Sequence, residues 1–146
     1  MSTHRIRCTL AAVGLAMLTL GAPAWAEDEH PIDQALSACL ETPEGMSTHG
    51  MRACLDTANA EWDRELNRIW KDLMRELPAE AQTALRASQR QWLSFRDAEI
   101  AALEAAYGQM DGTMYLVMLA DAVVTLTRDR VRQLDALLEA QRSSAQ

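Results

Sequence analysis

The segment MRACLDTANAEWDRELNRIWKDLMREL, residues 51–77, carries the strongest structural signal in the chain. Its apolar side chains recur at steps of three and four, which places them on one face of a helix: Met51, Leu55, Ala58, Trp62, Leu66, Ile69, Leu73 and Leu77. Ser47 or Thr48 can cap the start of this helix, and Pro78 interrupts the pattern. The spacing therefore predicts one long amphipathic helix that ends near Leu77.

The C-terminal half of the chain has the same periodicity. A second long helix is expected to begin at Pro78, with Trp92 and Phe95 on its apolar face. Gly108 is placed to end it as a left-handed cap. A third long helix is expected from about Met114 to Arg142, after a short turn that contains Asp-Gly.

A short helix is also expected before the first long one. Pro31 can open it, and Pro43 stops it within a Thr-Pro-Glu-Gly turn. Strand-like runs are short and lie inside helical periodicity. The sequence therefore predicts an all-α fold, an antiparallel bundle of three long helices plus one short N-terminal helix.

Residues 1–26 have the three parts of a secretory signal peptide. Two arginines precede an apolar or small-residue run, residues 9–22, and Ala-Trp-Ala at the end offers a cleavage site after Ala26. The run has about 14 residues, which is short for a permanent membrane span. We therefore expect cleavage near Ala26 and a periplasmic or secreted protein without a membrane anchor.

Residues 27–142 are long enough for one helical domain, and residues 143–146 are expected to form a disordered tail. Removal of the signal peptide takes away two arginines and no acidic residue, so the formal charge changes from −7 to −9. Nucleic acids and anionic membrane surfaces bind basic faces, which this composition does not favour. An acidic protein can instead attract a basic protein partner.

Two cysteines remain after signal cleavage, Cys39 and Cys54, because Cys8 belongs to the signal peptide. An even pair in an oxidising compartment indicates one disulfide, which would join the short helix to the first long helix. A loop of this size contributes about 3 kcal/mol of stability in the chain-entropy description. The pair is not a C-x-x-C motif, and no cluster of soft ligands completes a metal site with it.

Two polar clusters lie on either side of Pro78. Residues three or four apart share a helix face, and an antiparallel hairpin that turns at Pro78 would bring the two clusters together. The residues are Asp63, Asn67, Gln89, Trp92, Arg96 and Asp97.

These clusters have two interpretations. In the first, a polar network fixes the register of the helices, with Arg96 paired to Asp63 or Asp97. In the second, Trp62, Trp92 and Arg96 form an exposed recognition patch, because these residue types dominate interface hot spots. The first interpretation is favoured, since structural ion pairs outnumber functional ones among such networks.

No catalytic site is predicted, and we expect a protein that is not an enzyme and has no cofactor. Both histidines of the mature chain precede the long helices, so no base is placed against a nucleophile. Met46, His49 and Met51 are soft ligands within six residues and are weak candidates for Cu(I). Methionines commonly fill irregular cores, so no metal is predicted.

The same clusters carry a resemblance to a known family. The segments are Cys39, Cys54, Asp63-x-x-Leu66-Asn67-x-x-Trp70, Gln89-x-x-Trp92-x-x-Phe95-Arg96-Asp97 and Leu126-Thr127-x-x-Arg130-x-x-x-Leu134. Through them the chain resembles the exported family named for the lysozyme inhibitor LprI, over about Cys39 to Leu138. The resemblance implies inhibition of lysozyme by binding.

Our hypothesis from the sequence is therefore a periplasmic binding protein of the lysozyme-inhibitor kind. Its partner would be lysozyme or another envelope or secreted protein. The alternative is a periplasmic binding module for soft metals (Cu or Ag) or for envelope stress, based on the methionine and histidine cluster.

Overall fold

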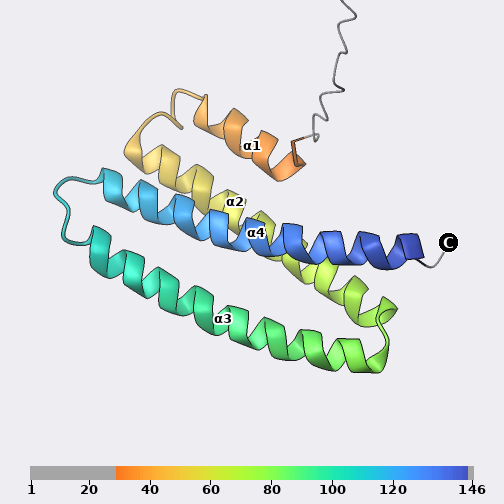
Figure 1. Ribbon diagram of the computed structural model, residues 1–146. Coiled ribbons are helices and arrows are strands. Elements are labelled where there is room, and N and C mark those ends of the chain that lie inside the picture. The colour runs from red at the N-terminus through yellow and green to blue at the C-terminus, as the bar shows by residue number, and fades with distance from the viewer. Residues whose placement is uncertain (1–28, 145–146) are drawn as a thin grey trace, which may run out of the picture.

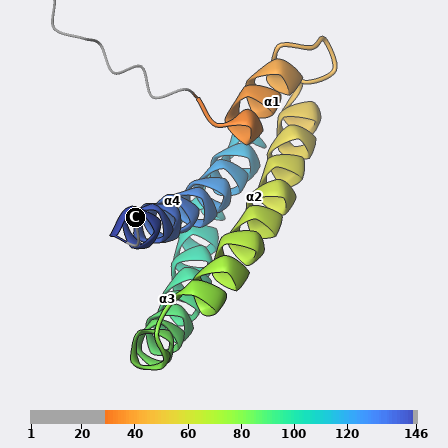
Figure 2. The same cartoon turned by 90° about the vertical axis from the view of Figure 1, so that its right-hand side faces the viewer.

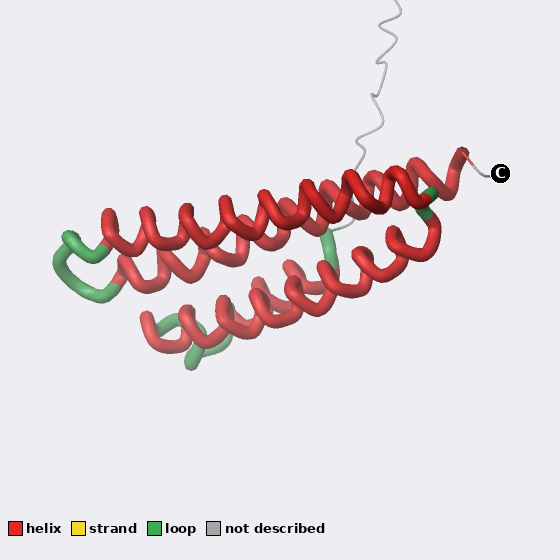
Figure 3. Tube along the Cα trace, turned by 90° about the horizontal axis from the view of Figure 1, so that it is seen from below, coloured by secondary structure: helices red, strands yellow, loops and turns green. Residues whose placement is uncertain are grey.

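The computed structural model describes residues 29–144, so the expected signal peptide, residues 1–26, lies outside the described residues. This part of the chain consists of four helices joined by short loops and contains no strand (Figure 3). The helices are α1 Pro31–Leu40, α2 Thr48–Glu76, α3 Ala79–Tyr107 and α4 Met114–Ser144. The prediction of an all-α bundle with three long helices and one short one is confirmed.

Local sequence signals set the ends of α2. The Ser47 hydroxyl accepts a hydrogen bond from the Gly50 N–H (3.0 Å), which satisfies one of the free donors of the first turn. At the other end, Pro78 forces Leu77 into extended backbone with ψ 146°. The first long helix therefore stops at Glu76, within one residue of the expected end.

The ends of α3 and α4 differ from expectation. Gly108 has φ −63° and donates its N–H to the Glu104 carbonyl, so it continues the right-handed spiral and the predicted left-handed cap is wrong. The positive φ that reverses the chain belongs to Gly112 (φ 89°). Helix α4 continues to Ser144, so Ser143 and Ser144, which we expected in a disordered tail, are helical.

The core lies between α2 and α4, which run side by side in the same direction (Figure 1). They are parallel because the antiparallel helix α3, which lies between them in the sequence, returns the chain to the end of the molecule where α2 begins. Thr127 donates to Asn59 (3.3 Å) near the middle of the pair, and Arg142 pairs with Glu76 (2.8 Å) at its C-terminal end. The buried apolar residues are Leu55, Ala58, Trp62, Leu66, Ile69, Leu73, Leu77, Val124, Val131, Leu134 and Leu138.

Helix α1 is fastened to α2 by the Cys39–Cys54 disulfide, whose Cα atoms are 5.9 Å apart. The expected pairing of these cysteines is confirmed. The turn between the two helices is tight, because a Cβ on Gly45 would collide with the Cys39 carbonyl and one on Gly50 with the Glu44 carbonyl. Glycine at both positions allows the close backbone approach that the disulfide joins.

Helix α1 is also tied to α4 by a buried carboxylate. Asp33 is almost fully buried and pairs with Arg128 (3.3 Å) and Arg132 (3.2 Å) of α4. The His30 ring, at the start of α1, lies 4.4 Å from the Trp62 ring of α2. Helix α1 therefore covers the α2–α4 pair on the side opposite α3 (Figures 1 and 2).

Helix α3 is the least embedded helix of the four. None of its residues is buried, and its backbone lies closer to α4 than to α2, which it contacts through the Arg96–Asp63 ion pair (4.0 Å). Leu93 is 38% exposed and Phe95 is 54% exposed, so the prediction that Phe95 faces the core is wrong. The physical reason is that α2 already occupies the apolar face of α4, and the alanine-rich α3 packs only along its edge.

None of the four helices in residues 29–144 has the length and apolar character needed to cross a bilayer.

Truncation of two leucines tests this division between core and edge. Leu73→Ala removes a fully buried side chain and should lower the free energy of unfolding by about 3 kcal/mol or more. Leu93→Ala makes the same chemical change on the exposed side of α3 and should lower it by less than about 1 kcal/mol. Urea denaturation of both variants measures the difference, and equal losses would contradict the division.

Candidate functional site

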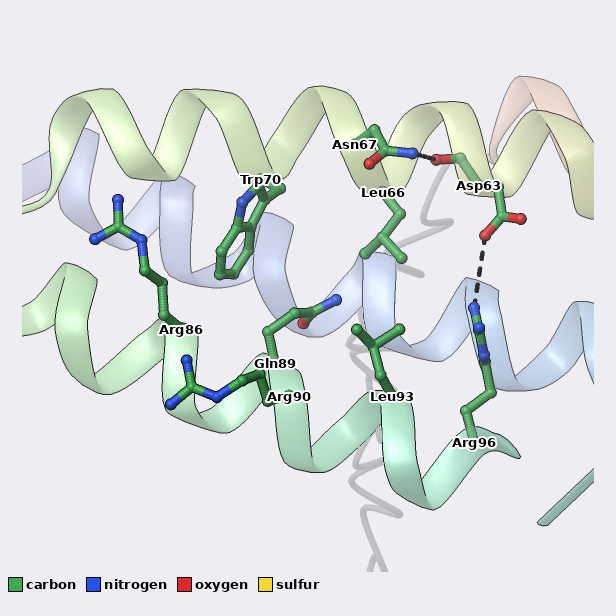
Figure 4. Close-up of a pocket in the computed structure, with 9 residues that line it drawn as sticks. All are labelled: Asp63, Leu66, Asn67, Trp70, Arg86, Gln89, Arg90, Leu93 and Arg96. Atoms are coloured by element: carbon green, nitrogen blue, oxygen red, sulfur yellow. Dashed lines mark hydrogen bonds and ion pairs between the residues drawn. The ribbon is translucent and has the colours of Figure 1, made fainter. Parts of the chain in front are cut away.

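The open space between α2 and α3 forms a groove of about 490 Å³ (Figure 4). It exists because the backbone of α3 lies closer to α4 than to α2, so that the side of α3 toward α2 is only partly filled by side chains. Its lining comes from both helices: Asp63, Leu66, Asn67 and Trp70 from α2, and Arg86, Gln89, Arg90, Leu93 and Arg96 from α3. Four of the six predicted polar-cluster residues therefore line one groove.

The α2 wall is polar at one end and apolar toward the other. The Asn67 side-chain amide donates to the Asp63 backbone carbonyl (2.8 Å), which fixes the orientation of that amide. The Asp63 carboxylate faces Arg96 of α3 at 4.0 Å across the groove (Figure 4). Leu66 and Trp70 continue the wall as apolar surface.

The α3 wall carries three guanidinium groups. Arg96 pairs with its neighbour Asp97 (3.2 Å) as well as with Asp63. Arg86 donates a hydrogen bond to the neutral Gln82 side chain (3.4 Å). Within residues 29–144, no carboxylate lies within 4.0 Å of Arg86 or Arg90. This wall is therefore positively charged and only partly neutralised.

Trp92 does not line the groove but packs on the α4 side of α3. The Arg96 and Arg130 guanidinium carbons lie 5.4 Å and 5.7 Å from its ring centre, within range of cation–π attraction. Trp92 is half-buried and packs against the α2–α4 core. Trp92 therefore contributes to the packing of α3 against the core.

Arg130 of α4 is the residue that bonds α3 to the core. It is only 8% exposed, and it donates to Gln89 (3.0 Å) and Ser88 (3.4 Å) of α3. Burial lowers the pKa of Arg130, but an arginine remains protonated at physiological pH. No carboxylate pairs with it within residues 29–144. The polar clusters predicted from the sequence did not include Arg130, although it stands in the third segment of the family resemblance.

The structure excludes one form of the recognition-patch interpretation. Trp62 is fully buried, because the three-four spacing of α2 directs it into the α2–α4 interface. It cannot belong to an exposed patch. Asp97, in contrast, is exposed and contacts only Arg96. The clusters therefore divide into core residues, an anchoring tryptophan and groove-lining residues.

The weak metal candidates lie at the other end of the molecule, around the start of α2. Met46 and His49 are exposed, and Met51 is half-buried. His49 lies in the first turn of α2, so the expectation that both histidines precede the long helices is wrong for His49. Between residues 29 and 144, no three His, Cys, Asp or Glu side chains are grouped closely enough to hold a metal ion.

The described residues thus form a small all-α domain with one disulfide and an open, partly charged groove. Residues 39–134 match the family described as Lysozyme inhibitor LprI. Because the match covers more than half of the chain, the protein belongs to this family, and the resemblance noted in the sequence is confirmed. The family implies protein binding of the lysozyme-inhibitor kind.

The fold is also similar to a crystal structure of an uncharacterized protein from Burkholderia thailandensis. The two chains are 32% identical with a TM-score of 0.73, over 77% of this chain and 55% of that one. This chain therefore corresponds to about half the length of that protein. No curated protein matches the sequence.

A single substitution tests the role assigned to Arg130. Arg130→Ala removes the bonds to Ser88 and Gln89 and should lower the free energy of unfolding by about 1–3 kcal/mol. Arg90→Ala is the matched control on the exposed groove wall and should change it by less than about 0.5 kcal/mol. Chemical denaturation distinguishes them; an Arg130 variant as stable as the control would remove the anchoring role.

Proposed function

We propose that this chain is an exported protein that binds lysozyme and inhibits it by binding alone. The observation that carries the proposal is the family match over residues 39–134. That range begins at the first disulfide cysteine and includes all of α2 and α3 and most of α4. The matched segment therefore contains the entire groove together with most of the core that positions it.

The charge of the chain supports this choice of partner. The chain has a formal net charge of −7 and a pI near 4.9, whereas lysozyme is a basic protein. Opposite charges accelerate the encounter of two proteins and favour the matching partner over acidic ones. An acidic inhibitor therefore suits a basic enzyme.

Export is supported by two independent features. The first 26 residues have the composition of a signal peptide, with cleavage expected near Ala26. The Cys39–Cys54 disulfide is typical of proteins in oxidising compartments. In the periplasm or outside the cell, the protein would meet lysozyme at its peptidoglycan substrate.

Inhibition of peptidoglycan lysis tests the proposal directly. The purified, oxidised protein should slow the clearing of a peptidoglycan suspension by lysozyme in a dose-dependent way, without being consumed. Because opposite charges contribute to binding, the apparent affinity should fall about tenfold or more between about 50 and 300 mM salt.

A matched control is an unrelated acidic protein of similar size and charge at the same concentration, which should not inhibit. Calorimetry of the same mixture reports binding independently of turnover. If lysozyme is neither bound nor slowed at about a hundredfold molar excess of the protein, the proposal is wrong.

A further inference from the structure

The groove between α2 and α3 differs in charge from the rest of the molecule. Its lining contains three arginines and one carboxylate, Asp63, in a chain with a formal net charge of −7. Arg96 is neutralised by Asp63 and Asp97, which leaves Arg86 and Arg90 as the positive charge of the groove. Six other arginines, on α2 and α4, do have carboxylates within 4.0 Å: Arg64, Arg68, Arg75, Arg128, Arg132 and Arg142.

The two arginines have a defined spacing. Arg86 and Arg90 are four residues apart on α3, so their side chains start one helical turn apart on the same face. Both line the groove, and Arg86 extends from α3 toward α2 (Figure 4). Guanidinium groups bind carboxylates through paired N–H donors, and two of them one turn apart match two carboxylates at the same spacing.

Apolar surface continues the groove beside these charges. Leu66 and Trp70 of α2 face Leu93 of α3, which is 38% exposed (Figure 4). On α3 the lining extends from Arg86 to Arg96, about 15 Å along the helix axis. That length matches about three turns of a bound helix. The open space between α2 and α3 thus leaves a position on which a short amphipathic segment can pack.

We propose that the α2–α3 groove binds an acidic amphipathic segment of a partner protein, with two carboxylates on Arg86 and Arg90. The apolar face of the segment packs on Leu66, Trp70 and Leu93 in the manner of a helix in a groove. The Gln89 side chain is held by Arg130, so the floor between the two arginines is fixed before the segment binds. This inference goes beyond the proposed function. The acidic segment is inferred from the positive charge of the groove, whereas the lysozyme proposal rests on the family match.

Binding of model peptides tests the inference without lysozyme. The probe is a fluorescein-labelled amphipathic peptide of about twelve residues, with glutamates four apart and leucines on the adjacent face. A second peptide has glutamine in place of both glutamates. Fluorescence anisotropy with the full oxidised protein should show binding of the glutamate peptide, with at least about tenfold weaker binding of the glutamine peptide.

Two double variants assign the binding to the groove. Arg86→Gln with Arg90→Gln should weaken binding of the glutamate peptide at least about tenfold. Arg64→Gln with Arg75→Gln removes the same charge from exposed positions of α2 outside the groove, and should change the affinity less than about twofold. Circular dichroism melts of both variants should match the original protein, since all four side chains lie at exposed positions.

Four results would overturn the inference. These are equal binding of the glutamate and glutamine peptides, equal losses in the two double variants, no peptide binding at about 1 mM protein, and binding of free glutarate as tight as that of the peptide. Sedimentation of the protein alone could give a fifth such result. If the protein dimerises and the Arg86/Arg90 double variant does not, the groove binds a second copy of this chain instead of a partner protein. Failure of lysozyme inhibition leaves all these measurements unchanged, so the two proposals fail separately.

Discussion

The parallel contact between α2 and α4 determines where every other part of the molecule can lie. Both helices bury one continuous stripe, and the fully buried side chains all belong to them, Trp62, Ile69 and Leu138 among them. Short loops can join such parallel helices only through a third, antiparallel helix. Helix α3 therefore serves mainly to connect α2 to α4, and it contributes no buried residue to the core. Helix α1 covers one side of the α2–α4 pair and is held there by the disulfide and by the buried Asp33.

The groove follows from that order of importance. The apolar face of α4 packs on α2, so α3 packs only along the edge of α4. Contacts of Trp92 and Arg130 hold α3 at this edge. On the side of α3 that faces α2, Arg86, Arg90 and Leu93 therefore remain accessible to solvent. The residues of the family motifs divide accordingly: some hold α3 in place, and others, such as Asp63 and Arg96, line the space that its placement opens.

Sequence periodicity predicted the helices because each one depends on local signals: the stripe of α2, the cap at Ser47 and the break at Pro78. The disulfide could also be predicted from the sequence, since only two cysteines remain after the expected cleavage. Periodicity identifies an apolar face but not the helix that covers it, so the exposure of Phe95 could not be predicted. The burial of Trp62, in contrast, follows from its place in the apolar stripe of α2, whereas the contacts of Arg130 depend on which helices pack together.

Native-state hydrogen exchange tests most directly whether α2 and α4 hold the fold while α3 is an edge. Core amides of α2 and α4, around Ile69 and Leu134, should exchange only through global unfolding, whereas amides of α3 around Leu93 should exchange faster through local opening. Protection of α3 equal to that of α4 would contradict this arrangement, because α3 would then belong to the core and the groove beside it would not be an open surface.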